Sequence, residues 1–481
     1  MIPLTLEQLA DVVGGELMDG ADAYRCVDAV TIDSRSAAPG ALFVPLRGER
    51  ADGHDFIADA ASRGAAGYLA MAGLPLPPVA GGVVVDDPAD ALLGLGAWVR
   101  DIANPLTVGV TGSNGKTTTK DLIAAAAGAG RATVASVGSH NNEYGVPLTL
   151  CQLRLSSEVL VAELGARGRG QIAQLALVVR PDIAVVTTVS GAHLERFGTV
   201  EAVAAAKAEL VQSLGPGGLA VLNADDHRVA AMAAYAPGRV VTYGRGADAD
   251  WRAEDIEFDG LARPLFRVRR GATSAGGEPA AVEVMLPVPG EHNVNNAVAA
   301  LAVADACGVP LARAAQALEG AVVSRWRMEL RETAGGVVVL NDAYNANPAS
   351  MEAALRTLAR IRVTGRRWAV LGRMAELGPG AEAAHGGIGR LAAGLGVDGL
   401  IVVTDPAYPE VAAIRAGAIA GPGGMSPATV LQVADPCEAA TLLERWLRPG
   451  DAVLVKASRA AGLERVAEAL GRRISGGVRE A

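Results

Sequence analysis

Residues 110–119 read Val110-Thr111-Gly112-Ser113-Asn114-Gly115-Lys116-Thr117-Thr118-Thr119. An apolar run, Leu106 to Val110, leads into this stretch, and an alanine-rich run from Lys116 to Ala127 continues from it. A strand, a glycine-rich turn and a helix in this order are typical of a phosphate-binding loop, because backbone N–H groups and the positive end of the helix dipole meet there. The full GxxxxGK[ST] spacing is not met, since Val110 stands where its first glycine would be. A glycine-rich turn without a ligand is the alternative, and the flanking strand and helix favour the phosphate loop.

Two side chains of this loop, Lys116 and Thr117, have predicted chemical roles. The Lys116 ammonium can reach the β- and γ-phosphates of a nucleotide, and the Thr117 hydroxyl is placed to ligate Mg²⁺. We therefore predict that the ATP phosphates are bound by the loop residues Thr111, Gly112, Ser113, Asn114, Gly115, Lys116, Thr117 and Thr118.

Three later residues extend the prediction, each with a plainer alternative. Glu163 ends the apolar run from Glu158 and can support Mg²⁺, although an acid at a strand end often simply faces solvent. His193 follows the run Ile183 to Val189 and can bind a second metal or be an ordinary loop histidine. Lys207 stands in an alanine-rich helix, where the residues alone favour a solvated lysine.

Bulk properties narrow the class of protein. The chain has 481 residues, of which 50% are hydrophobic, so it can bury about two to four cores. The formal net charge of −9 argues against a nucleic-acid partner, which requires clustered Lys and Arg. The 4 cysteines are scattered and the start lacks a signal-peptide pattern, so we expect a cytoplasmic protein. The longest uncharged stretch, 64–85, is broken by prolines and predicts no membrane insertion.

Alternating apolar strands and helices predict an α/β fold in three domains. Residues 1–88 form a small α/β domain. Residues 89–322 form a central ATPase-like domain with a mostly parallel sheet, whose segment 245–287 looks antiparallel and contains the loop Ser274 to Gly277. Residues 323–481 form a doubly wound, Rossmann-like domain with strands at Val337 to Leu340, Trp368 to Leu371, Leu400 to Val403 and Ala452 to Val455.

Taken together these motifs resemble the Mur ligase family over nearly the whole chain. The loop 110–119, the Glu163 strand, the His193 loop and the Lys207 helix occur in the family's order. Residues 290–297 (GEHNVNNA) resemble the motif whose later asparagine, here Asn296, touches the adenine side of ATP. Residues 324–329 (SRWRME) resemble the segment whose arginine, here Arg327, reaches the ATP phosphates, and Asp342 in NDAYNANP takes the ribose-binding place.

The resemblance also implies a substrate class. Residues 32–35 (IDSR) and 52–56 (DGHDF) look like the family's UDP-binding domain, so Ser34, Arg35 and Asn142 are predicted to hold the UDP-substrate. Residues 141–147, 341–348 and 370–378 are closest to the branch that takes UDP-N-acetylmuramoyl-tripeptide and D-alanyl-D-alanine, and the DNPR motif of another branch is absent. Arg373, Tyr144 and Ala457 depart from the family pattern.

By this resemblance the protein is an ATP-dependent amide ligase that works through an acyl phosphate. The resemblance also implies that two Mg²⁺ ions are held by Thr117, Glu163, His193 and Lys207, the last as a carbamylated lysine. Lys116 and Arg327 stabilise the transferring phosphoryl group, so Lys116, Lys207, His193 and Arg327 are the predicted catalytic residues. We expect a monomer. The alternatives are a folate polyglutamate-type synthase, against which the N-terminal domain argues, and a P-loop switch or transport ATPase.

Overall fold

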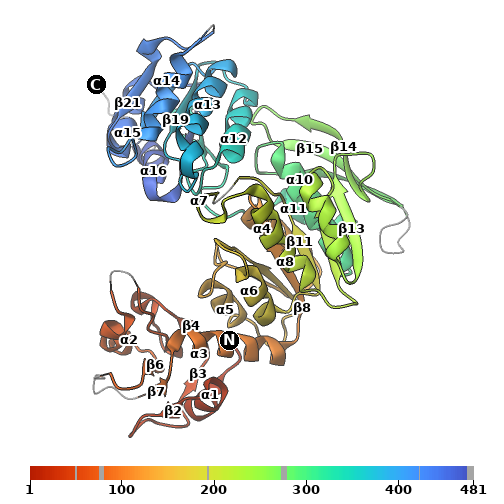
Figure 1. Cartoon of the computed structure of the whole chain (residues 1–481), viewed down its shortest axis with the longest axis vertical. Coiled ribbons are helices and arrows are strands. Elements are labelled where there is room, and N and C mark those ends of the chain that lie inside the picture. The colour runs from red at the N-terminus through yellow and green to blue at the C-terminus, as the bar shows by residue number, and fades with distance from the viewer. Residues whose placement is uncertain (49–50, 75–80, 192–193, 272–278, 422, 474–481) are drawn as a thin grey trace.

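The computed structural model of the protein describes residues 1–48, 51–74, 81–191, 194–271, 279–421 and 423–473. Three α/β units follow one another along the long axis of the molecule (Figure 1). They are built on a five-stranded, a nine-stranded and a six-stranded sheet. The predicted α/β class with three units is therefore confirmed.

The N-terminal unit has the sheet order β2-β7-β6-β5-β4, in which β4 to β7 run parallel and β2 antiparallel. The apolar side chains of β5, β6 and β7 are buried because helices cover the sheet. The elements are β1 (Leu4–Thr5), α1 (Leu6–Val13), β2 (Glu16–Leu17), β3 (Cys26–Val27), β4 (Ala29–Thr31), β5 (Ala41–Phe43), α2 (Ile57–Ser62), β6 (Gly67–Met71) and β7 (Gly82–Val85).

A long helix, α3 (Pro88–Ala103), joins this unit to the next. It begins where the Asp87 carboxylate accepts a hydrogen bond from Ala89 N at 2.6 Å, and Pro88 occupies its first turn. It packs against α1 and β6 on one side and against the central helices α5 and α6 on the other. It ends at Asn104, which has a φ of 45°.

The central sheet has the order β16-β15-β14-β13-β12-β11-β8-β10-β9. Strands β8 to β13 pair in parallel, whereas β14, β15 and β16 form antiparallel pairs, as predicted for segment 245–287. The loop 274–277 lies outside the described residues. The strands are β8 (Leu106–Thr111), β9 (Thr133–Ala135), β10 (Val159–Glu163), β11 (Ile183–Val186), β12 (Leu219–Asn223), β13 (Arg239–Gly244), β14 (Trp251–Phe258), β15 (Pro264–Arg270) and β16 (Ala280–Met285).

Helices cover both faces of the central sheet, and its parallel strands are accordingly mostly apolar. Helices α4, α10 and α11 share one core cluster with the sheet, and α5, α6 and α8 share the other. The helices are α4 (Lys116–Gly128), α5 (Gly145–Leu150), α6 (Gln171–Val179), α7 (Leu194–Phe197), α8 (Val200–Gln212), α9 (His227–Ala230), α10 (His292–Ala306) and α11 (Leu311–Glu319).

One predicted strand is too long. The apolar run suggested a strand from Ile183 to Val189, but β11 ends at Val186. Beyond it the chain leaves the sheet because the next residues bind the phosphate loop: Thr187 Oγ1 donates to Asn114 O at 2.6 Å, and Ser113 N donates to Thr188 O at 2.7 Å. The sequence pattern reports burial, and Thr187 and Val189 are indeed buried, although they lie beyond the end of the strand.

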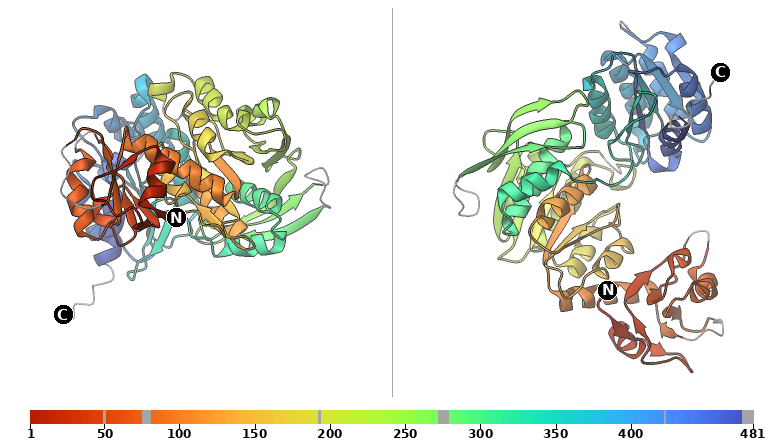
Figure 2. Two further views of the ribbon diagram at one scale, coloured as in Figure 1. Left: turned by 90° about the horizontal axis from the view of Figure 1, so that it is seen from below. Right: turned by 180° about the vertical axis from the view of Figure 1, so that it is seen from behind.

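The C-terminal unit has the sheet order β17-β18-β22-β19-β20-β21, with only β17 antiparallel among these described strands. Helices α12, α13 and α14 pack on one face and α15 and α16 on the other. Figure 2 shows the molecule from two further sides. The elements are β17 (Glu329–Glu332), β18 (Val338–Asn341), α12 (Pro348–Arg360), β19 (Arg367–Leu371), α13 (Ala381–Gly394), β20 (Gly399–Val403), α14 (Ala413–Ile419), β21 (Val430–Val433), α15 (Pro436–Trp446), β22 (Ala452–Lys456) and α16 (Glu464–Arg473).

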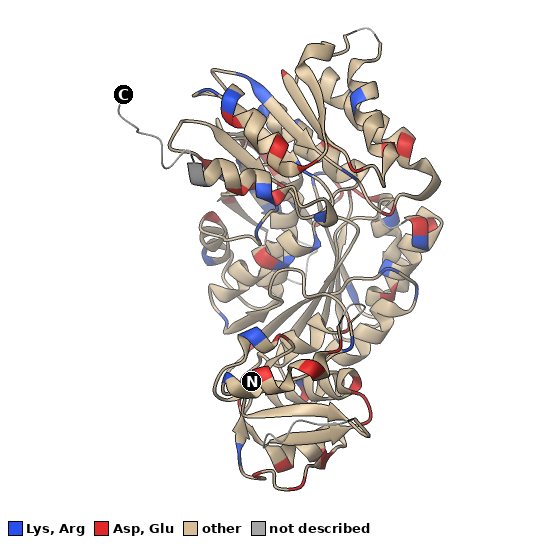
Figure 3. Cartoon of the chain, turned by 90° about the vertical axis from the view of Figure 1, so that its left-hand side faces the viewer, with Lys and Arg blue, Asp and Glu red and all other residues tan. Residues whose placement is uncertain are grey.

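The turn between β14 and β15 anchors the C-terminal unit to the central one. Ala262 in this turn is fully buried in the same core cluster as Met351 and Leu355 of α12. Arg362 N also donates to Gly260 O at 2.8 Å. Positions of basic and acidic residues are intermixed along the ribbon on the side of the molecule that Figure 3 shows. Within the described residues no helix is long and apolar enough to span a membrane.

Candidate functional site

The phosphate loop joins β8 to α4, and its shape requires two glycines. Gly112 has a φ of 146°, and a Cβ there would lie 1.9 Å from Thr187 Oγ1. Gly115 has a φ of 81°, and a Cβ there would lie 2.7 Å from Asn296 Oδ1. Both positions lie in the region of φ that favours glycine and leave no room for a side chain. The predicted Thr111 ends β8 just before the loop, and the predicted Asn296 of α10 packs against the loop at Gly115.

Residues 187–190 support the loop from behind. Ser190 N donates to Ser113 Oγ at 2.9 Å, and Asn114 Nδ2 donates to Ser190 Oγ at 3.0 Å. On the other side Thr119 Oγ1 donates to Asn296 Oδ1 at 3.1 Å. These hydrogen bonds fix the loop, so its backbone N–H groups are arranged before any ligand binds.

Lys116 begins α4 and lies over the loop. Its Nζ donates to Gly112 O at 2.7 Å. Burial lowers the pKa of its ammonium group and the Arg327 charge lowers it further, while Glu163 acts in the opposite direction. The charges of Glu163 and Arg327 therefore both act on Lys116, although the three residues come from three different parts of the chain.

Glu163 is fully buried at the end of β10, opposite Val110 of β8. Its Oε2 accepts a hydrogen bond from Thr117 Oγ1 at 2.7 Å, and its Oε1 accepts one from Asn141 Nδ2 at 2.7 Å. The solvent-facing alternative is therefore wrong. Hydroxyl and carboxylate oxygens side by side suit a hard cation such as Mg²⁺.

Asn141 was not among the predicted site residues. The sequence prediction selected its neighbour Asn142, whose Oδ1 accepts a hydrogen bond from Gly145 N at 2.9 Å before α5. Asn142 is exposed, while Asn141 holds the buried carboxylate. Asn141 and Asn142 are adjacent and of the same residue type, so the sequence does not show which of them contacts Glu163. The backbone conformation decides it.

Lys207 lies on α8 and is 3% exposed, so the solvated-lysine alternative is wrong. Burial lowers its pKa to about 7, helped by the Lys116 charge and opposed by Glu209 and Glu163. Burial therefore favours the neutral amine of Lys207 over its charged form. His193 lies outside the described residues.

The C-terminal unit contributes Arg327 to the same place. Its guanidinium stacks on the Tyr344 ring at 4.2 Å, and its Nε is buried without a hydrogen-bond partner among the described residues. A second contact joins the units directly: Asn347 Nδ2 donates to Asn114 Oδ1 at 2.7 Å. Nothing in the spacing of the sequence indicated this pair.

Asp342, the predicted ribose ligand, is already bound by its own unit. Its carboxylate accepts a hydrogen bond from Met328 N at 3.0 Å and pairs with Lys456. Asp342 is not one of the described residues that line the cavity between the central and C-terminal units.

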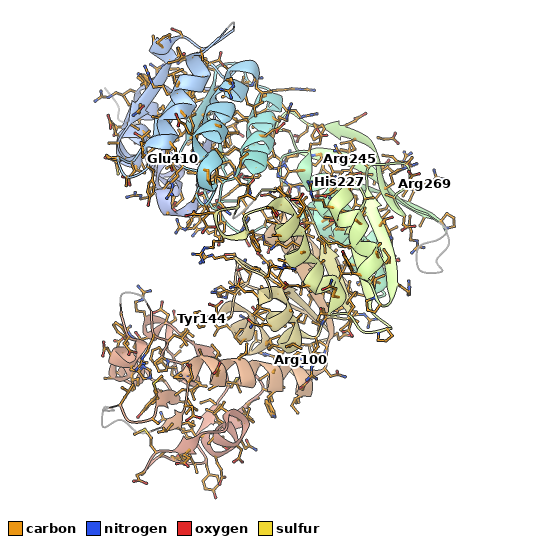
Figure 4. All side chains as sticks on the ribbon, in the orientation of Figure 1. Arg100, Tyr144, His227, Arg245, Arg269 and Glu410 are labelled. Atoms are coloured by element: carbon orange, nitrogen blue, oxygen red, sulfur yellow. The ribbon has the colours of Figure 1, made fainter. Side chains whose placement is uncertain are left out.

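That cavity, of about 800 Å³, lies between the central and C-terminal units. Asn114, Gly115 and Asn296 of the predicted site line it together with residues of α12. At its rim Glu291 pairs with Arg245, from the central unit, and with Arg360 of α12. Figure 4 labels Arg245 on the side of the central unit that faces the C-terminal unit. The cavity has room for a nucleoside next to the phosphate loop.

The predicted residues of the N-terminal unit are less enclosed. Ser34 is buried, while the Arg35 side chain is 80% exposed and pairs with Asp33 at 2.7 Å. They stand on the 3₁₀ turn Ser34–Ser36 after β4.

Comparison with family models matches three stretches of the chain. Residues 110–304 match the Mur ligase middle domain, residues 326–459 the Mur ligase glutamate ligase domain, and residues 27–92 the Mur ligase family catalytic domain. The chain belongs to the Mur ligase family. The predicted family is confirmed, and with it the expectation of a ligase instead of a P-loop switch or transport ATPase.

Relatives in this family cover nearly the whole chain. The chain is 44% identical to the UDP-N-acetylmuramoyl-tripeptide--D-alanyl-D-alanine ligase of Mycobacterium tuberculosis, with 98% of each chain covered. Its structure is similar to that of MurF from Acinetobacter baumannii, with a TM-score of 0.82, 29% identity and 97% and 98% of the two chains covered. It is also similar to MurF from Thermotoga maritima in complex with ADP, with a TM-score of 0.77, 28% identity and 93% and 98% covered.

Proposed function

We propose that this protein is the ATP-dependent ligase that joins D-alanyl-D-alanine to UDP-N-acetylmuramoyl-tripeptide, releasing ADP and phosphate. One observation carries the proposal: Lys116, Arg327, Glu163 and the buried Lys207 converge beside a preformed phosphate loop. A relative with that activity, 44% identical over 98% of the chain, supports the substrates. The N-terminal unit, which those relatives also cover, argues against the folate polyglutamate-type synthase.

The residues of the chain divide the work of the reaction. Residues 111–118 and Asn296 hold ATP, with its base in the 800 Å³ cavity. Lys116 and Arg327 offset charge on the γ-phosphoryl group as it moves to the tripeptide carboxylate, which makes an acyl phosphate. The amine of the dipeptide then attacks the acyl carbon and phosphate leaves. No protein nucleophile takes part, because positioning of the three substrates supplies the rate.

We propose that Thr117, Glu163, His193 and Lys207 hold two Mg²⁺ ions. The Thr117–Glu163 hydrogen bond of 2.7 Å brings two suitable oxygen donors together. Once bound, such ions would supply positive charge that offsets the negative charge of the phosphate and of the attacking carboxylate. Lys207 can join this set only as a carbamate: its neutral amine adds to CO₂ and loses a proton, which gives an anionic oxygen ligand. A pKa of about 7 and burial at 3% exposure favour that reaction.

The assignment has a direct test. With the purified full-length protein and ATP, phosphate release is expected only when both UDP-N-acetylmuramoyl-tripeptide and D-alanyl-D-alanine are present. Release that ignores the amine would leave a nucleotide-cycling ATPase, and release with a folate and glutamate would favour the synthase. Replacing one substrate at a time identifies which of the three holds.

We also propose that residues 1–88 form the UDP-substrate-binding domain, residues 89–322 the ATP-binding domain and residues 323–481 the ligase domain. Ser34, Arg35 and Asn142 are proposed to hold the UDP-substrate. Among the described residues no helix could span a membrane. We propose that the protein is cytoplasmic and monomeric.

The role of Arg35 gives a prediction. Arg35→Ala is expected to raise the KM for the UDP-substrate about tenfold while leaving the KM for ATP unchanged, because Arg35 is exposed and its loss costs the fold little. Steady-state phosphate release at varied concentrations of each substrate measures this. An equal rise in both KM values would point to a disturbed fold and contradict the assignment.

A further inference from the structure

Arg373 lies where three loops of the C-terminal unit meet. It follows β19, its carbonyl accepts a hydrogen bond from Ser458 N after β22 at 2.8 Å, and its side chain lies against Tyr408 after β20. These loops all leave the carboxyl edge of the sheet, and chain order reverses there, because β22 inserts between β18 and β19. Ligands of open α/β sheets bind at such switch points.

The Arg373 guanidinium is held in place but keeps donors open. It stacks on the Tyr408 ring at 3.3 Å, and its Nε lies 3.6 Å from Glu410 Oε1, beyond hydrogen-bond distance. That Nε is buried and has no hydrogen-bond partner among the described residues, while the side chain as a whole is 25% exposed. Figure 4 labels Glu410 within this unit. A planar guanidinium oriented in this way is suited to bind a carboxylate.

Neighbouring cations at this edge have other tasks. The Lys456 ammonium pairs with Asp342 and donates to Asn345 O at 2.8 Å. Arg459 pairs with Glu464. Arg327 lies beside Lys116 and serves the phosphate. Arg373, by contrast, has only the 3.6 Å ion pair with Glu410 among the described residues, so its guanidinium can still bind a second carboxylate.

The loop that carries Arg373 reaches the reaction centre. Glu376 O accepts a hydrogen bond from Glu195 N at 3.2 Å, which ties this loop to the segment after β11. Between the two segments lies a cavity of about 290 Å³, lined by apolar side chains such as Leu194 and Leu377 and bordered by Ser190 and Asn347. A dipeptide spans about 7 Å, so a receptor for its far end must stand on a loop next to the centre.

We propose that Arg373 binds the terminal carboxylate of the incoming dipeptide and so selects an amine substrate with a free carboxyl end. The methyl groups of the dipeptide face the 290 Å³ cavity, and its amine points to the acyl phosphate. This inference rests on the proposed function and adds a specificity residue to it.

The test compares D-alanyl-D-alanine with D-alanyl-D-alaninamide, which lacks the negative charge. Phosphate release is measured with the full-length protein, ATP and UDP-N-acetylmuramoyl-tripeptide. The unmodified protein is expected to prefer the acid over the amide by about 10- to 100-fold in kcat/KM, the range of a charge-assisted hydrogen bond. Arg373→Gln is expected to remove that preference by lowering kcat/KM for the acid alone.

Two matched variants separate recognition from structure. Glu410→Gln removes the ion-pair partner of Arg373 and is expected to keep the preference for the acid, and so is Arg196→Gln, which removes an exposed cation of α7. Equal losses with acid and amide in Arg373→Gln, or the same loss in Glu410→Gln, would overturn the inference. An unmodified protein that releases no phosphate with either amine would instead overturn the proposed function.

Discussion

Lys116→Ala is expected to lower kcat for phosphate release by about 10²- to 10³-fold, the loss found when one preorganised donor to a charged transition state is removed. Burial lowers the pKa of its ammonium and the charges of Glu163 and Arg327 act on it, so solvent screens its charge poorly. The charge of Lys116 also acts on Lys207, which joins that lysine to the same centre. A single-turnover measurement with saturating substrates reports the chemical step directly.

Stability separates this effect from misfolding. In the protein Lys116 donates to Gly112 O at 2.7 Å, and the glycines keep the loop shape through their own backbone. Thermal unfolding of Lys116→Ala should therefore stay within a few degrees of that of the unmodified protein, as for a partly exposed substitution. A folded variant that turns over at nearly the normal rate would remove this reading of the phosphate loop.

Features that depend on short-range sequence patterns could be predicted. The phosphate loop, the Glu163 strand and the three α/β units were all predicted, because each depends on periodicity and on residue types a few positions apart. Residues 187–190 show the limit of that reasoning: the predicted strand ran on to Val189, but the chain leaves the sheet after Val186 and supports the loop at 113 and 114.

Contacts between distant parts of the chain could not be predicted. The Asn114–Asn347 hydrogen bond joins residues more than two hundred positions apart, and Glu291 pairs with arginines of two units. Lys207 is the sharpest case. Its helix looks solvated in sequence, yet α8 packs against β8 and β11 and carries the lysine into the site. Only the family resemblance pointed to its role.

Lys207→Ala is expected to lower activity by about 10³-fold or more, because it removes the proposed anionic ligand from a buried place beside Glu163. A short carboxylic acid such as acetate or propionate should restore part of the activity and saturate with concentration, since it supplies the missing oxygens in the space that the side chain leaves. Phosphate release titrated with each acid measures the rescue.

The pH dependence of the unmodified protein tests the same idea without a mutation. The amine of Lys207 is neutral above its pKa of about 7 and protonated below it, and only the neutral amine adds CO₂. Activity should therefore fall as the pH drops below about 7, fall further in CO₂-free buffer, and return when bicarbonate is added.

Lys116→Ala provides the matched control for the rescue. It removes a positive charge from the same centre, so added acid cannot replace what it lost and should leave that variant inactive. Rescue of Lys207→Ala alone would mean that the missing group is an anionic oxygen ligand and not bulk or positive charge. A Lys207→Ala protein that keeps most of its activity and does not respond to added acid would contradict the carbamate proposal, because activity would then not depend on an oxygen ligand at this position.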